Sequence, residues 1–165
     1  MSYNIDKEYF KSFFSHIVKI PSPTGYYRKL NPVLEQYAAE LGLGMTYDNK
    51  SAAYLTIPGE DTSKTVQIAA HADTIGFMVR SIDGDGTLRV RNVGEVNYQS
   101  TEGESATVIT RDGRQYTGLI ACQSHSVHVF DDARSSPRDE HTMVVLLDEK
   151  VSSAKDVKEL GIRNG

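Results

Sequence analysis

A histidine and an aspartate two residues apart have the types and spacing best suited to chemistry in this chain. His71 and Asp73 directly follow a short apolar segment, residues 66–70. A neutral imidazole at a rigid strand end binds a transition metal well when a carboxylate holds its other ring nitrogen. The spacing permits that pairing. As a bare pattern, however, His-x-Asp is common, and the pair could simply end a strand and bind loop amides.

Other polar side chains are weaker candidates. Glu102 and Glu104 lie close in sequence, but the segment around them has the composition of a turn, so we expect a solvated loop. His125 and His128 are three residues apart, and His141 follows. Because residues three apart on a strand point to opposite faces, we expect these histidines at the surface or in an interface rather than on a metal.

Three further features have structural interpretations. Cys122 ends an apolar run and is the single cysteine of the chain, so we expect a buried thiol without a disulfide. Residues 83–86, Asp-Gly-Asp-Gly, resemble part of a calcium loop but lack its later ligands, and they predict a hairpin turn. His16 is expected at the edge of the first helix.

The elements that must position His71 come before it. Apolar residues at spacings of three and four predict helices over residues 6–20 and 30–41, the first ended by Pro21. Extended segments are predicted at 44–48, 52–57 and 66–70. We expect residues 66–70 to form a central strand of an α/β sheet, because such strands present polar residues at their C-terminal ends.

Beyond residue 76 the pattern changes to short strands separated by turns. Strands are predicted at 77–82, 88–93, 107–110, 115–120 and 142–147, and a serine-capped helix at 152–161. The sequence therefore predicts an α/β part over residues 1–75 and a β domain over residues 76–165. A helix between residues 77 and 93 would contradict this division.

Composition narrows the class of protein. The chain has 165 residues, of which 39% are hydrophobic and 24% charged, with a net charge of −4. These values suit a soluble globular protein and provide no basic face for nucleic acid. We also expect no membrane span and no signal peptide, and the lone cysteine suggests the reducing cytoplasm.

Three segments carry a resemblance to a known family. Residues 68–79, Ile-Ala-Ala-His-Ala-Asp-Thr-Ile-Gly-Phe-Met-Val, resemble the first metal-ligand motif of the glutamyl and tetrahedral (TET) aminopeptidases. Residues 20–25 are similar to that family's early loop, and residues 158–165 to the segment that closes its inserted domain. The matches run in the expected order along nearly the whole chain.

The resemblance implies specific roles. His71 would bind one of two divalent ions, zinc or cobalt, and Asp73 would orient it. The family's other ligands and its general base follow the inserted domain, whereas this sequence ends at Gly165, so we expect no appreciable peptidase activity from this chain alone. Thr74 departs from the pattern, because many members carry an acidic residue there.

The same resemblance implies fold, partners and function. Residues 1–75 would be the N-terminal portion of a phosphorylase/hydrolase-like zinc-peptidase α/β domain, and residues 76–165 an inserted β domain, PDZ-like or a barrel, that joins subunits. The function would be metal-dependent removal of N-terminal residues from peptides. The alternative is a non-catalytic oligomerisation and gating module. Either way we expect a dimer or larger assembly, as in the family's dodecamers. No paired acid and nucleophile supports a polysaccharide hydrolase.

Overall fold

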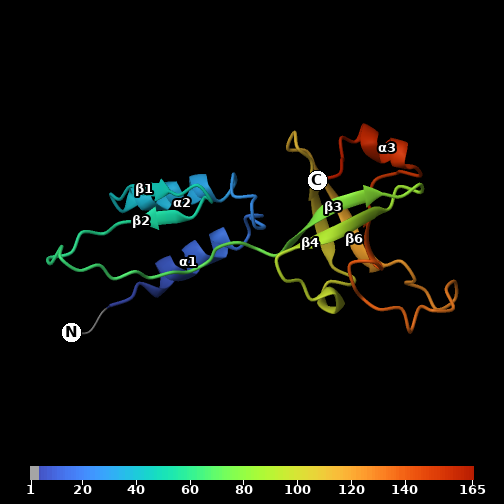
Figure 1. Ribbon diagram of the computed structural model, residues 1–165, viewed down its shortest axis with the longest axis horizontal. Helices are drawn as coiled ribbons and strands as arrows, with labels where there is room; N and C mark the ends of the chain where they lie inside the picture. The colour runs from blue at the N-terminus through green and yellow to red at the C-terminus, as the bar shows by residue number, and fades with distance from the viewer. Residues whose placement is uncertain (1–3) are drawn as a thin grey trace. The chain divides into compact units, whose positions relative to one another are not determined.

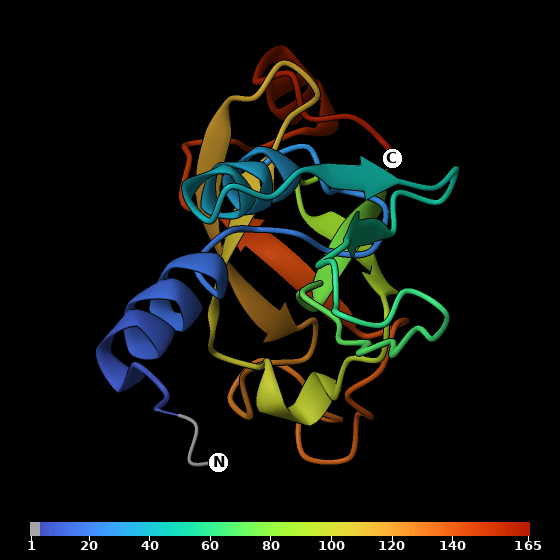
Figure 2. The same ribbon diagram turned by 90° about the vertical axis from the view of Figure 1, so that its left-hand side faces the viewer.

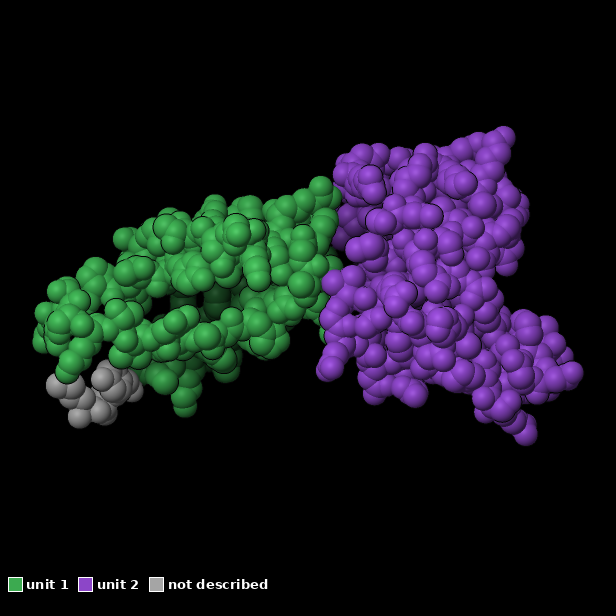
Figure 3. Space-filling model, in the orientation of Figure 1, with its two compact units in different colours: residues 1–76 green, residues 77–165 purple. Residues whose placement is uncertain are grey.

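The chain forms two compact units. A computed structural model describes residues 4–165; one unit ends at Gly76 and the other spans Phe77–Gly165 (Figure 3). The first unit contains the helices α1 (Lys7–Ile17) and α2 (Asn31–Glu40) and the strands β1 (Met45–Tyr47) and β2 (Ala53–Leu55) (Figure 1). The second contains five strands, a 3-10 turn and one helix. Together they make a mixed α/β fold.

Both predicted helices of the first unit are confirmed. The carboxylate of Asp6 accepts hydrogen bonds from the backbone amides of Glu8 and Tyr9, which caps α1 at its N-terminus. Phe13 packs edge-on against Tyr37 of α2 with ring centroids 4.7 Å apart. Nδ1 of His16 lies 2.9 Å from the Tyr37 hydroxyl, so His16 sits where the two helices meet.

Two of the three extended segments predicted in this unit are also confirmed. Strands β1 and β2 pair antiparallel, with Thr46 opposite Tyr54. Their connection is held by Asp48, whose carboxylate accepts hydrogen bonds from the amides of Lys50 and Ala52. A short hairpin therefore follows α2, as the sequence predicts.

The prediction of a central strand over residues 66–70 is wrong for this structure. The segment forms no strand, and Val66 and Ile68 are 89% and 92% exposed. A strand is stabilised by hydrogen bonds to neighbouring strands and by cover on its faces. Among residues 4–165 no strand pairs with this segment, so its apolar sequence alone does not produce a sheet.

The second unit is built on a sheet of order β3-β4-β7-β6-β5. Its strands are β3 (Gly76–Ile82), β4 (Leu88–Val93), β5 (Ser105–Ile109), β6 (Gln115–Cys122) and β7 (Met143–Leu147). β6 pairs antiparallel with both β5 and β7, and β4 with β7. The sheet curls into a half-barrel (Figures 1 and 2). All five predicted strands are confirmed, and residues 77–93 contain no helix.

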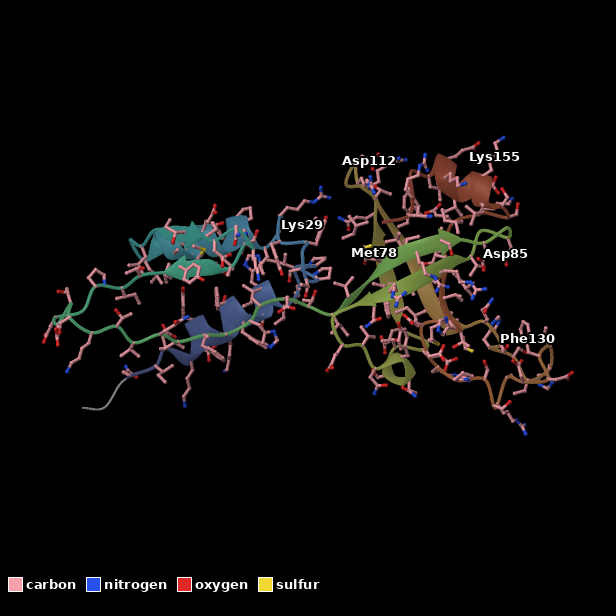
Figure 4. The ribbon with its side chains drawn as sticks, viewed as in Figure 1. Lys29, Met78, Asp85, Asp112, Phe130 and Lys155 are labelled. Carbon is pink, nitrogen blue, oxygen red and sulfur yellow. The ribbon has the colours of Figure 1, made fainter. Side chains whose placement is uncertain are left out.

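Turns and loops of this sheet also match the pattern. Between β3 and β4 the amide of Gly86 donates to the carbonyl of Asp83 at 3.0 Å, and Gly86 has a φ of +91°, so the predicted hairpin turn is confirmed. Asp85 lies at this turn, and Phe130 lies in the long loop between β6 and β7 (Figure 4). The 3-10 turn η1 (Tyr98–Ser100) lies between β4 and β5.

One apolar cluster forms the core of the second unit. Cys122 is fully buried in it, as predicted, and the helix α3 (Ala154–Glu159) contributes Val157. The Ser153 side chain caps α3 by accepting from the amide of Asp156. The buried members of the core are Leu88, Val90, Ile120, Cys122, Met143, Val145, Val157 and Ile162.

No helix in the described part of the chain is both long and apolar enough for a membrane crossing.

Candidate metal centre

The two residues singled out from the sequence are in contact. Nδ1 of His71 lies 3.0 Å from Oδ1 of Asp73. Because an ionised carboxylate only accepts hydrogen bonds, this contact places the ring proton on Nδ1. The His71 side chain is 89% exposed and that of Asp73 36% exposed. Nε2 of His71 is thereby left as the nitrogen with an available lone pair.

Thr24 holds the other oxygen of the same carboxylate. Its hydroxyl donates to Oδ2 of Asp73 at 3.0 Å. The hydrogen bonds from Thr24 first, and then from His71, lower the pKa of Asp73 below its ordinary value. The carboxylate is therefore kept ionised, and both of its oxygens are hydrogen-bonded.

A seam of hydrogen bonds joins the loop of residues 22–24 to residues 72–74. The Ser22 hydroxyl donates to the Ala72 carbonyl at 3.1 Å, and the Ser22 amide donates to Oγ1 of Thr74 at 3.2 Å. The Thr74 amide returns a bond to the Ser22 carbonyl, and Pro23 and Thr74 form a parallel bridge. Ser22 is fully buried. The seam thus fixes the backbone on both sides of Asp73.

Both halves of this arrangement can be recognised in the sequence, but their contact cannot. The loop at residues 20–25 and the His71 motif are separate matches to the family, and Thr74 stands out only as a departure from its pattern. Ser22, Thr24 and Thr74 were missed as neighbours of the site. Nothing local connects residues about fifty positions apart, so only the shared family resemblance of both segments could have suggested it.

The interpretation of Glu102 as a solvated residue is wrong. Its carboxylate accepts two hydrogen bonds from Arg138, at 2.7 and 3.1 Å, and both side chains are largely covered. The guanidinium of Arg138 lowers the pKa of Glu102. Glu104 is exposed, as expected. Sequence could not reveal the ion pair, because Arg138 lies in the long loop between β6 and β7.

The remaining histidines lie at the surface. His125, His128 and His141 are all exposed, as predicted, and Nδ1 of His125 contacts the Gln123 carbonyl at 3.2 Å. In the part of the chain that the structure describes, no three His, Cys, Asp or Glu side chains come together in a way that could hold a metal ion. His71 with its carboxylate fits the role of one ligand, and these residues supply no complete set.

Comparison with known proteins identifies the family. Residues 51–165 match the model of the M42 glutamyl aminopeptidases. The chain belongs to this family. M42 members are metal-dependent aminopeptidases, which is consistent with a metal-ligating role for an exposed, carboxylate-bound histidine.

Individual proteins are also similar to this chain. YhfE of Bacillus subtilis, provisionally named an aminopeptidase, is 39% identical over 149 residues, which are 90% of this chain and 43% of that protein. The chain thus spans less than half the length of the curated relatives it matches. The TET aminopeptidase of a marine sediment archaeon of the Thaumarchaeota superposes with a TM-score of 0.82 at 21% identity, over 98% of this chain and 44% of that one.

A second solved structure shares the fold. It is the TET1 peptidase of Pyrococcus horikoshii, which superposes with a TM-score of 0.73 at 21% identity over 93% of this chain and 44% of that chain. That peptidase can assemble into a tetrahedron or a large octahedral shell.

Proposed function

We propose that this chain supplies the first metal ligand of a two-metal aminopeptidase that removes N-terminal residues from peptides. The observation that carries the proposal is the His71–Asp73–Thr24 chain of contacts, in which one imidazole nitrogen is bound and the other is exposed. Membership of the M42 family, whose members are metal-dependent aminopeptidases, supports metal binding by the exposed nitrogen. On this proposal the enzyme acts in the cytoplasm, where the lone thiol of Cys122 stays reduced.

Each residue of the site has a distinct part. Nε2 of His71 would bind one divalent ion, and Asp73 would orient the imidazole and strengthen it as a ligand. A pair of such ions activates water and polarises the scissile carbonyl when bound. Zinc and cobalt both suit a site of imidazole and carboxylates. The remaining ligands and the general base would come from the part of the family's length that this chain does not span.

On this proposal the two parts of the chain have different functions. Residues 1–75 would belong to the catalytic α/β domain, and residues 76–165 would be the inserted β domain that joins subunits, with a PDZ-like or barrel fold. Residues 66–70 would then become a central strand once neighbouring strands of the complete domain pair with them. Their present exposure is the feature that such pairing would remove.

The function is tested by hydrolysis of aminoacyl chromogenic substrates with zinc or cobalt. In a protein that contains this chain together with the remaining family length, His71→Ala should lower turnover about 100-fold or more, because even loss of a residue that supports a metal ligand commonly costs about 10–100-fold. His141→Ala, another exposed histidine, is the matched control and should leave turnover unchanged. Equal activity of the two variants would reject the role of His71.

A second candidate is a non-catalytic oligomerisation and gating module. Two separate observations favour it: the second unit has a closed core, and the first unit has large exposed apolar side chains, among them Phe10 and Ile68. Exposed apolar surface of this kind tends to bind a partner. Sedimentation at micromolar concentration should show a dimer or larger species, and a monomer of 18.3 kDa would contradict the proposal.

A further inference from the structure

Thr24 binds the side of Asp73 that faces away from His71. The two oxygens of this one carboxylate have different partners: Oδ1 contacts Nδ1 of His71, and Oδ2 accepts the hydroxyl of Thr24. Both contacts are 3.0 Å long. Because both oxygens are hydrogen-bonded, the carboxylate cannot rotate without losing one of these two hydrogen bonds.

The imidazole itself is held by little else. His71 is 89% exposed, and among residues 4–165 Asp73 is the hydrogen-bond partner of its ring. The orientation of the ring therefore depends on Asp73. The orientation of Asp73 in turn depends on Thr24, which the seam between residues 22–24 and 72–74 holds in place.

Resting on the proposed metal-binding role of His71, we propose that Thr24 is a positioning residue that fixes the Asp73 carboxylate so that His71 keeps its proton on Nδ1 and presents Nε2 to the metal. Thr24 acts through Asp73 and touches neither the metal nor the substrate in this role.

The physical reason lies in the two tautomers of neutral imidazole. An unconstrained histidine side chain in water prefers the proton on Nε2, which is the nitrogen that must be unprotonated to bind a metal here. A carboxylate opposite Nδ1 reverses that preference by accepting the Nδ1 proton. Without the Thr24 hydroxyl, the partly exposed carboxylate is free to rotate toward water, and the preference weakens.

The test is the tautomer of His71, measured in metal-free protein. Long-range proton–nitrogen NMR spectra of nitrogen-15-labelled protein, recorded in alkaline solution, distinguish the two ring nitrogens. His71→Gln identifies the signals. The variants are Thr24→Val, which keeps the branched shape without the hydroxyl, and Thr24→Ser, which restores the hydroxyl. Thr117→Val removes another hydroxyl–carboxylate contact, to Asp148, and is the matched control.

The expected result is a mainly Nδ1-protonated His71 in the wild type and in the Thr117→Val and Thr24→Ser variants. Thr24→Val should lower the ratio of Nδ1-protonated to Nε2-protonated ring several-fold. An unchanged ratio in Thr24→Val, or a ratio that Thr24→Ser fails to restore, would overturn the inference. A merely structural role for Thr24 predicts lower stability without a tautomer change.

A cobalt titration of the same samples separates this inference from the proposed function. Cobalt should broaden the His71 ring signals at concentrations that leave those of exposed His141 sharp. If His71 is not broadened first while its tautomer still depends on Thr24, the metal role of His71 fails and the positioning of its ring by Thr24 stands. Preferential broadening with a tautomer independent of Thr24 rejects the positioning role alone.

Discussion

The two units of this molecule differ in how completely they enclose their own apolar residues. Phe77–Gly165 buries a cluster that includes Leu88, Met143 and Ile162 between its curled sheet and α3. Among residues 4–76 of the first unit the buried apolar residues are Leu30 and Ala38, while Phe10 and Ile68 are exposed. The proposed chemistry nevertheless lies in the first unit. The site is therefore held by a hydrogen-bonded seam between two distant segments, and the second unit is held by an apolar core.

Disrupting the core of the second unit should lower the stability of the protein most. Met143 has no exposed surface, so Met143→Ala should lower the free energy of unfolding of that unit by about 2–5 kcal/mol. Met78 on β3 is 49% exposed, so Met78→Ala is the matched control. It should lower the free energy of unfolding by about 0.5 kcal/mol or less. Urea unfolding of both variants measures the contrast, and equal losses would show that the core is not where the stability lies.

A smaller effect should depend on pH through Glu102. Arg138 lowers the pKa of Glu102 in the folded state, so the pair stabilises the second unit above the ordinary pKa of glutamate. That stability is lost as pH falls through the lowered pKa. Glu102→Gln should therefore cost about 1–2 kcal/mol at neutral pH, and the cost should shrink as the solution is acidified below about pH 4.

Glu104→Gln is the control for this pH dependence. Glu104 is exposed and lies two residues away, so its substitution should not change how stability varies with pH. Unfolding curves at several pH values decide the matter. A loss in Glu102→Gln that stays constant down to acid pH would mean that packing, not the charge, is responsible.

The cap of α3 should contribute less. Ser153→Ala removes the oxygen that accepts from the Asp156 amide and should cost about 1 kcal/mol or less, because one unsatisfied helix donor becomes exposed to water. Ser105 on β5 is exposed, and Ser105→Ala serves as the comparison. A difference in thermal unfolding midpoint between the two variants measures the cap. Identical midpoints would show that the Ser153 cap does not stabilise the unit.

What the sequence could predict follows the same division. The strands of the second unit could be read from the sequence because Gly86 and the Asp-Gly turns punctuate them and their partners lie within the same segment. The His71–Asp73 pair could be predicted because both residues are local. The contact of Thr24 with Asp73 and that of Arg138 with Glu102 could not, since each joins distant segments. The prediction of a strand over residues 66–70 is wrong because an apolar sequence forms a strand only where neighbouring strands pair with it.

A substitution at Ile68 tests the exposure of residues 66–70 directly. Ile68 is 92% exposed, so Ile68→Ser should change the free energy of unfolding of this chain by about 0.5 kcal/mol or less, which is the usual range for surface sites. In a protein with the remaining family length, where these residues are proposed to form a central strand, the same substitution should cost several times more, because it places an unpaired hydroxyl inside a core. Val127, 52% exposed in the second unit, provides the control: Val127→Ser should be near neutral in both proteins. A large loss from Ile68→Ser already in the 165-residue chain would show that the segment is packed in solution.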